Sequence, residues 1–456
     1  MSFLKFFEMK FTSVLAGAVA AAAALSAAPT AEAGNPAPPQ PHTHRNISTY
    51  VINLDDKPED RYLKIVPEFN ETVWKFWNED FANHTLARDA LFLLVDKRGK
   101  ENDEQMREIQ GLANAARLPV QFVHAMQMLY ELGTLMVPVA NLTEYPDAFV
   151  DPIPEEWAAL KDLPWRGPAC TGIVAKNSVD GTVYHARNLD FSPLPIMQDL
   201  VYNAIFEKGG KEVFRSQMVA GYTMVITGAR MGEDGYSIER NTRYTNHVGG
   251  NELMLDNLLN KKTTLNGWQL RKVLETNATY EEAVQSLSTV PYTSTEYTII
   301  SGVQKGTILS RDPDDVAYQQ VLGQPNFNEP EDYIIMTNFD FFFDDIRETF
   351  DDTSGHTGTQ CLMSRSHMHA GASAPSRSGR VLNCVLPPLV SVCFRAGHPT
   401  RREVAQEILN ASIPTGLTQD VLFDTINAQG VIAYDTIFQA VINIEKGIWN
   451  VSQPNI

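Results

Sequence analysis

A thiol, a guanidinium and a carboxylate stand close together in one short stretch of this sequence. Cys170 begins an apolar-rich run, and a second such run carries Arg187 and Asp190. Between the runs lies Asp180-Gly181, a dipeptide that suits the positive φ angles of a type I′ hairpin turn. If this pair is a two-residue loop, Cys170 lies across from Phe191. The three polar side chains then meet at the open end of one hairpin.

A cysteine beside a fixed cation has the surroundings of a nucleophile. The positive charge of Arg187 favours the thiolate and lowers the pKa of a nearby thiol. The spacing by itself also fits a core hairpin that holds a buried cysteine and a structural ion pair. Both readings are open at this point.

The residue types in the hairpin favour the catalytic reading. Cys170-Thr-Gly-Ile-Val-Ala175 and His185-Ala-Arg-Asn-Leu-Asp-Phe191 resemble the acid ceramidase and N-acylethanolamine acid amidase family, N-terminal-nucleophile cysteine hydrolases of the choloylglycine hydrolase superfamily. The resemblance covers roughly Ser48 to Leu362 and resumes near Thr400. Further segments carry it, namely Tyr50 to Arg61, Leu270 to Ala283 and Thr337-Asn-Phe-Asp340.

The resemblance implies an α+β fold, a four-layer αββα sandwich preceded by a mainly helical pro-segment. It implies self-cleavage between Ala169 and Cys170, which splits the chain into an α subunit, 34–169, and a catalytic β subunit, 170–456. The α-amine that cleavage exposes on Cys170 has an ordinary pKa near that of a thiol and relays the thiol proton without a histidine. A side-chain base such as His185, His247 or His356 is the alternative. Neither a cofactor nor a metal is expected.

The same resemblance assigns roles to individual residues. Cys170 is expected to be the nucleophile, with Arg187 and Asp190 orienting and tuning it. Asn338, in Thr337-Asn-Phe-Asp340, is expected to donate its amide to the oxyanion. Two further candidates are Glu239 and Arg347. The first is part of a Glu-Arg pair like one near the family's active site, for which a surface ion pair is the alternative.

The predicted reaction is hydrolysis of the amide bond of an N-acylated lipid. Ceramide, cleaved to sphingosine and a fatty acid, is placed ahead of N-acylethanolamines. Bile-salt-like or penicillin-like amides and a catalytically impaired glycoprotein of the same fold are the alternatives. A membrane surface or a lipid-presenting helper protein is a possible partner. The net charge of −18 argues against nucleic acid.

Two departures from the family bear on activity and assembly. The family's Asp-Asp-Arg-Arg is Asp344-Asp345-Ile346-Arg347 here, so that one arginine is lost. The segment 34–169 contains no cysteine, so the family's inter-subunit disulfide to Cys361 cannot form. We therefore expect an α/β heterodimer from one precursor that lacks this bridge.

The N-terminus predicts entry into the secretory pathway. Residues 1–33 read as a signal peptide, with an apolar stretch before the small-x-small sequence Ala31-Glu-Ala33. Seven glycosylation sequons follow, at Asn46, Asn70, Asn83, Asn141, Asn277, Asn410 and Asn450. The expected location is a lysosome or the extracellular space.

The pattern along the chain predicts helices before the nucleophile and mixed structure after it. A helix is expected over 104–136 and another over 268–286, with strands at 218–227, 297–303, 307–310 and 333–337. Residues 364–398 read as an insertion or gene-model artefact, because Thr353 to Arg402 holds six arginines and no Asp, Glu or Lys. Histidines and cysteines in it, including His367 and Cys384, fit no standard zinc pattern.

Overall fold

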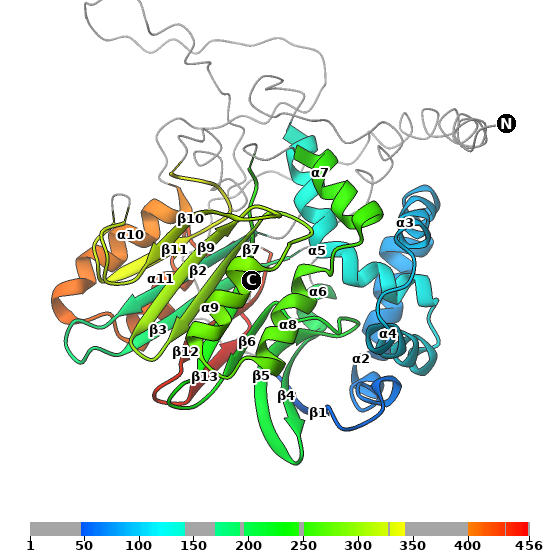
Figure 1. Cartoon of the computed structure of the whole chain (residues 1–456), viewed down its shortest axis with the longest axis horizontal. Helices are drawn as coiled ribbons and strands as arrows, with labels where there is room; N and C mark the ends of the chain where they lie inside the picture. The colour runs from blue at the N-terminus through cyan, green and yellow to red at the C-terminus, as the bar shows by residue number, and fades with distance from the viewer. Residues whose placement is uncertain are drawn as a thin grey trace, which may run out of the picture.

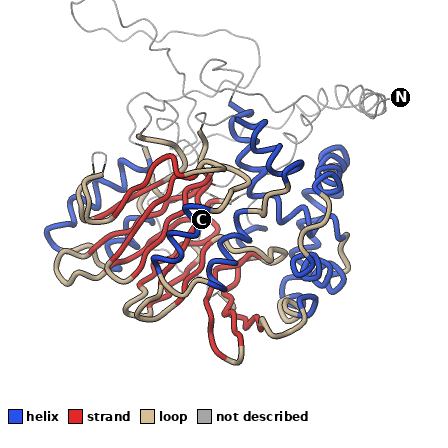
Figure 2. Tube along the Cα trace, viewed as in Figure 1, coloured by secondary structure: helices blue, strands red, loops and turns tan. Residues whose placement is uncertain are grey.

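The fold is α+β, as expected, with two β-sheets between layers of helices (Figures 1 and 2). The computed structural model describes residues 47–141, 169–191, 196–245, 250–326, 329–342, 400–433 and 435–454. The predicted signal peptide, the segment 364–398 and the cysteines other than Cys170 lie outside these residues. None of the described helices combines the length and apolar character that a membrane crossing needs.

The larger sheet has eight strands in the order β1-β4-β5-β6-β7-β8-β9-β10. Only β1 pairs in parallel; its neighbour is β4. All other pairs in this sheet are antiparallel. The strands are β1 (Thr49–Asn53), β4 (Val201–Lys208), β5 (Lys211–Val219), β6 (Thr227–Arg230), β7 (Tyr236–Thr242), β8 (Glu296–Gly302), β9 (Lys305–Arg311) and β10 (Val316–Val321).

The smaller sheet carries the predicted nucleophile. Its order is β11-β2-β3-β12-β13, and all its pairs are antiparallel. The strands are β2 (Ala169–Lys176), β3 (Val183–Asp190), β11 (Tyr333–Met336), β12 (Thr436–Asn443) and β13 (Ile448–Ser452).

The two sheets pack face to face, and helices cover both outer faces. Val174 of β2 lies in one apolar cluster with Ile299 and Ile308 of the larger sheet. Its chain neighbours Ile173 and Ala175 pack on the other side, against helices. This alternation is the period of a strand that is buried on both faces.

The outer helices complete the four-layer αββα arrangement. The larger sheet is covered by α8 (Asn266–Thr276) and α9 (Tyr280–Thr289), and the smaller by α10 (Arg401–Ser412) and α11 (Gln419–Asn427). Capping boxes at Thr279 and Thr400 begin α9 and α10 by satisfying backbone N–H groups of the first turn. Short elements are α6 (Ile196–Asp199), α7 (Gly250–Asp256), η4 (Asn257–Lys261) and η8 (Ile413–Thr415).

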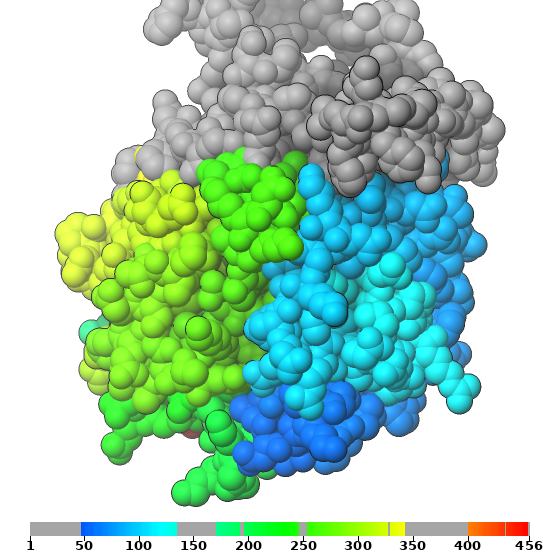
Figure 3. All heavy atoms as spheres, turned by 45° about the vertical axis from the view of Figure 1, so that its right-hand side comes forward, coloured from blue at the N-terminus to red at the C-terminus, as the bar shows by residue number. Residues whose placement is uncertain are grey.

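The segment before the nucleophile is mainly helical and packs against one end of the sandwich (Figure 3). It also contributes β1 to the edge of the larger sheet, so it shares both core and strand pairing with the residues after Cys170. Its helices are η1 (Pro58–Asp60), α2 (Val66–Phe76), η2 (Trp77–Ala82), α3 (Thr85–Arg98), α4 (Asp103–Ala116) and α5 (Val120–Asn141).

Three predicted elements are divided in the structure. The helix expected over 104–136 breaks at Arg117, which has a positive φ of 58° and precedes Pro119. The helix expected over 268–286 is interrupted where Thr279 caps α9. The strand expected over 218–227 ends at Val219, because the chain turns at Gly221 with a φ of 100°. Each break depends on local backbone geometry that apolar periodicity does not report.

Candidate active site

The hairpin of β2 and β3 places Cys170 at the start of a central strand. Cys170 pairs with Leu189, and Arg187 pairs with Gly172. The prediction that Cys170 lies across from Phe191 is wrong, because the loop is longer than two residues. The amide of Asn177 donates to the carbonyl of Thr182 at 2.8 Å and closes a four-residue loop.

The thiol of Cys170 is fully buried and has two polar neighbours. Nη2 of Arg187 donates to Sγ at 3.3 Å, and the hydroxyl oxygen of Tyr130 lies 3.6 Å from Sγ. Burial raises the thiol pKa to about 11, although Arg187 acts to lower it. Arg187 thus acts in the expected direction, but the net shift in the uncleaved chain is upward. Desolvation of the thiolate outweighs the neighbouring cation.

Arg187 is held by groups from the facing sheet. Its Nη1 donates to the hydroxyl of Thr227 and, at 3.3 Å, to the carbonyl of Ile226. Its Nε lies 3.6 Å from Oε2 of Glu239. From its own sheet, the ring of Phe438 on β12 lies 5.4 Å from the guanidinium carbon. These contacts aim the remaining nitrogen, Nη2, at the sulfur.

Glu239 lies in the interior between the sheets. The prediction allowed a surface ion pair, but both Glu239 and Arg240 are fully buried. The nearest basic side chains to Glu239 are Arg187, whose Nε is 3.6 Å from Oε2, and His185, whose Nε2 is 3.1 Å from Oε2. Among the described residues neither oxygen of Glu239 accepts a hydrogen bond of good geometry. A buried carboxylate in this state is an uncommon and costly feature.

His185 does not contact the thiol in the part of the chain that the structure describes. Its Nδ1 is 2.7 Å from the hydroxyl of Ser237, and Nε2 faces Glu239. His185, which the sequence left open as a side-chain base, lies two residues before Arg187 on the same strand and is therefore further from the thiol than Arg187 is. The other two histidine candidates, His247 and His356, lie outside the described residues.

Asn338 lies directly beside the nucleophile, although on another strand segment. Met336 of β11 pairs with Gly172 of β2, and the two strands are antiparallel. Two residues after Met336 and two residues before Gly172, Asn338 lies next to Cys170. Its Oδ1 accepts from the backbone N–H of Cys170 at 2.8 Å, and its Nδ2 donates to the carbonyl of Thr242 at 2.8 Å. In the uncleaved chain Asn338 therefore binds the nitrogen of the predicted scissile bond, and its oxyanion role stays a prediction.

Asp190 faces the opposite side of the sheet from the thiol. It pairs with Ala169, and its carboxylate binds Nη1 of Arg401 at 2.6 Å and the hydroxyl of Thr436 at 2.6 Å. Burial raises the pKa of Asp190 to about 6, while Arg401 acts to lower it. Asp190 is thus placed beside the residue before the scissile bond. Arg347, the remaining candidate, lies outside the described residues.

The sequence patterns did not indicate that α5 supplies side chains to the site. Tyr130 contacts the sulfur, and Glu131 forms a buried ion pair with Arg240 at 3.0 Å. Glu296 of β8 binds the same arginine at 2.6 Å. The available signal was a Tyr-Glu pair within the strongly apolar run of the predicted helix.

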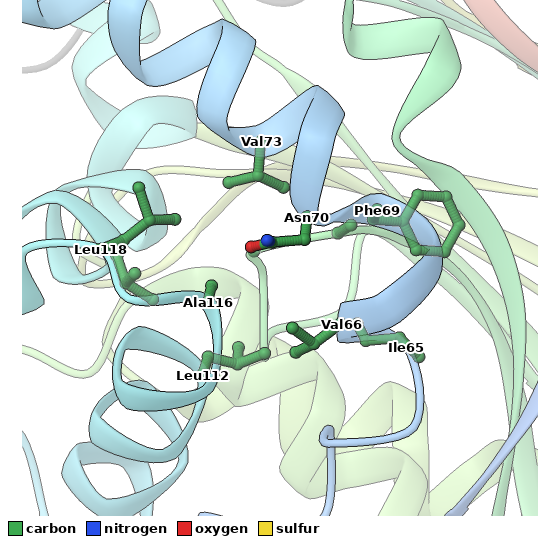
Figure 4. A pocket seen from close by; sticks show the side chains of 11 residues that line it. Ile65, Val66, Phe69, Asn70, Val73, Leu112, Ala116 and Leu118 are labelled. Atoms are coloured by element: carbon green, nitrogen blue, oxygen red, sulfur yellow. The ribbon is translucent and has the colours of Figure 1, made fainter.

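A separate pocket lies between the N-terminal helices and the turn at Gly221. It is entirely apolar except for Asn70 and has a volume of about 320 Å³, part of which is open solvent. Figure 4 shows Val73, Asn70 and Phe69 of α2 on one side and Leu112 and Ala116 on the other. None of the predicted catalytic residues lines it.

Named relatives match most of this chain. The N-acylethanolamine-hydrolyzing acid amidase of Caenorhabditis elegans is 27% identical over 295 residues, which are 64% of this chain and 74% of that protein. The acid ceramidase of Homo sapiens is 25% identical over 367 residues, 73% of this chain and 82% of that protein. The chain is similar in sequence to the acid ceramidases and N-acylethanolamine acid amidases.

Two other comparisons add less. No protein-family model matches the chain. The solved structure of the Caenorhabditis elegans N-acylethanolamine-hydrolyzing acid amidase ortholog covers 60% of this chain and 92% of its own, at 24% identity and a TM-score of 0.43. The similarity to the acid ceramidases and acid amidases therefore rests on the sequence matches.

Proposed function

We propose that this protein is a cysteine amidohydrolase that cleaves the amide bond of N-acylated lipids and is activated by cleavage of its own chain before Cys170. The observation that carries the proposal is that two side chains bind Cys170, one at its sulfur and one at its backbone nitrogen. Arg187 contacts its sulfur at 3.3 Å, and Asn338 binds its backbone nitrogen at 2.8 Å. The names of the two relatives support the type of bond.

Self-cleavage follows from the position of the thiol next to its own peptide bond. The sulfur attacks the carbonyl carbon of Ala169, the bond from that carbon to the nitrogen of Cys170 breaks, and the thiol proton ends on the nitrogen. Water then hydrolyses the thioester to the carboxylate of Ala169 and a free thiol. Asn338 keeps the new α-amine beside the sulfur, and Asp190 lies next to Ala169 on the other face.

The same atoms serve the external substrate. The freed α-amine takes the thiol proton, the sulfur attacks the acyl carbonyl, and the amine of the lipid leaves with a proton. Water completes the cycle by releasing the fatty acid. Arg187 stabilises the negative sulfur in both half-reactions, because its guanidinium stays charged and its other nitrogens are held.

Ceramide is the substrate that we propose first, with sphingosine and a fatty acid as products. N-acylethanolamines are the second candidate, because the acid amidase of Caenorhabditis elegans shares 27% identity with the chain. A panel of ceramide, N-acylethanolamines and bile-salt-like amides separates these substrates from one another.

We also propose a lysosomal or extracellular location and an α/β heterodimer of residues 34–169 and 170–456. The apolar N-terminal stretch and the sequons support the location, and three of the sequon asparagines, Asn83, Asn410 and Asn450, are exposed. The strand pairing of β1 with β4 supports an assembly that persists without the inter-subunit disulfide.

The deciding experiment incubates the purified chain at pH 4.5 and pH 7 and analyses it by gel and N-terminal sequencing. We expect two fragments, the larger beginning at Cys170, and hydrolysis of a lipid amide by the cleaved protein. Cys170→Ala is expected to stay intact and inactive. A wild-type chain that stays whole and inactive at both values contradicts the proposal and favours the catalytically impaired glycoprotein.

A further inference from the structure

One tyrosine reaches the nucleophile from the segment that precedes the predicted cleavage site. The side chain of Tyr130, on α5, is fully buried. Its hydroxyl donates to the carbonyl of Arg240 at 3.0 Å and lies 3.6 Å from Sγ of Cys170. Besides Arg187, it is the polar side-chain group that the described residues bring to this sulfur.

The ring of Tyr130 has little freedom to move. The guanidinium of Arg240 lies 3.9 Å from its centroid, a favourable cation–π distance. That guanidinium is in turn held by Glu131 at 3.0 Å and by Glu296 at 2.6 Å. Since Glu131 follows Tyr130 on α5, the same helical turn supplies both the ring on which Arg240 stacks and a carboxylate that binds Arg240.

The hydroxyl can serve the sulfur in both of its protonation states. It has one proton to donate and lone pairs to accept. With a neutral thiol it donates to the carbonyl of Arg240 and accepts from S–H, which orients the sulfur. With a thiolate its proton can turn to the sulfur instead. Burial raises the pKa of Tyr130 well above its ordinary value, so the hydroxyl keeps that proton.

We propose that Tyr130 is a positioning residue of the active site, which orients the sulfur of Cys170 and stabilises its thiolate. The proposal rests on the proposed function, in which the chain is cut before Cys170. It follows that the α subunit remains part of the working site after cleavage, because it supplies this hydroxyl from a separate chain.

The test compares Tyr130→Phe with Tyr236→Phe in the purified, self-cleaved protein. The first substitution keeps the ring under Arg240 and removes only the hydroxyl. The second removes another buried hydroxyl, which donates to the carbonyls of Val273 and Asn277. Two readouts are taken across pH: the rate of lipid amide hydrolysis and the ultraviolet absorbance of the thiolate. Cys170→Ala, which is expected to stay whole, gives the baseline for all absorbance other than that of Cys170, and the uncut forms of the two variants are titrated beside it.

We expect Tyr130→Phe to raise the thiol pKa by about one unit, which lowers the thiolate fraction and the rate about tenfold on the acidic side of the profile. Tyr236→Phe is expected to leave the pH profile unchanged. The proposal is overturned if both variants have the same profile, or if Tyr130→Phe lowers the rate equally at every pH. An inactive wild type contradicts the proposed function alone, since the thiolate titration still tests Tyr130.

Discussion

Gly172 illustrates how single residues make room for the charges around the nucleophile. It lies two residues after Cys170 on β2 and faces the larger sheet, where Glu239 and Ile299 approach it. A Cβ at this position would lie 2.0 Å from Oε1 of Glu239 and 2.3 Å from Cδ1 of Ile299. Because Gly172 has no side chain, the side chain of Glu239 fits beside Arg187.

We expect Gly172→Ala to lower the free energy of unfolding by about 1 to 3 kcal/mol, as overpacking does in cores. Displacement of Glu239 should also change the placement of Arg187 and slow self-cleavage. Gly306→Ala is the control, because its Cβ would crowd Val174 at 2.7 Å without touching the charged groups. Denaturant unfolding and the cleavage rate separate the two effects. Equal cleavage rates in the two variants would contradict the role of Gly172.

At the scale of elements, a buried ion pair joins α4, which precedes the predicted cleavage site in the sequence, to α8, which follows it. Glu108 of α4 accepts from Nη2 of Arg271 on α8 at 2.8 Å and from Nη1 of Arg61 at 2.8 Å. Both partners of the α4–α8 pair are buried. If the chain is cut before Cys170 as proposed, contacts of this kind and the β1–β4 pairing are expected to hold the two fragments together without a disulfide.

We expect Glu108→Gln to cost about 3 kcal/mol, because it removes the buried counter-charge that Arg61 and Arg271 share and leaves each with only a more exposed partner, Glu104 or Glu275. After cleavage the two fragments should then separate on size exclusion. Glu104→Gln is the matched control: Glu104 binds the same Arg61, but its side chain is 54% exposed, and such pairs contribute at most about 1 kcal/mol. Fragments that stay together in both variants would show that this pair does not hold the subunits.

At the scale of the whole molecule, buried carboxyl groups make stability depend on pH. Burial raises the pKa of Glu296 to about 7, against the lowering effect of Arg240. Burial likewise raises the pKa of Glu329 to about 7, against Arg402. Such groups hold a proton in the folded chain at pH values where the unfolded chain has lost it. The stability that these protonated carboxyl groups give the folded chain is fully present below about pH 4.5 and is lost as the pH rises through 7.

We therefore expect the wild-type protein to be more stable at pH 4.5 than at pH 7, with Glu296 contributing on the order of 2 kcal/mol. Glu296→Gln, which keeps an acceptor for Asn266 without a titrating group, should flatten this dependence. Glu281→Gln is the control, because Glu281 is exposed and its pKa is lowered by Lys305. Denaturant unfolding at the two pH values measures the slopes, and an unchanged slope in Glu296→Gln would refute the assignment.

Much of the candidate site follows from local sequence. Cys170 and Arg187 meet because two strands joined by a short turn must pair. The hairpin motif with its flanking segments indicated the resemblance that the sequence matches support. The α+β class follows from the change from helical to strand-like patterns after Cys170. The exact register did not follow: side-chain hydrogen bonds of Asn177 and Asp180 within the loop lengthen it, and this moves every cross-strand pair by two residues.

The sequence by itself determined the fold class and the contact between Cys170 and Arg187, and it predicted the nucleophile and the resemblance to the family, since these depend on residue types at short separations. Tertiary structure alone decided which charges are buried and what they face. Tyr130 reaches the site from 40 residues upstream of Cys170, with Glu131 next to it, and Glu239 and Glu296 reach it from the other sheet. Burial sets the thiol pKa, and burial arises only when distant segments exclude water together.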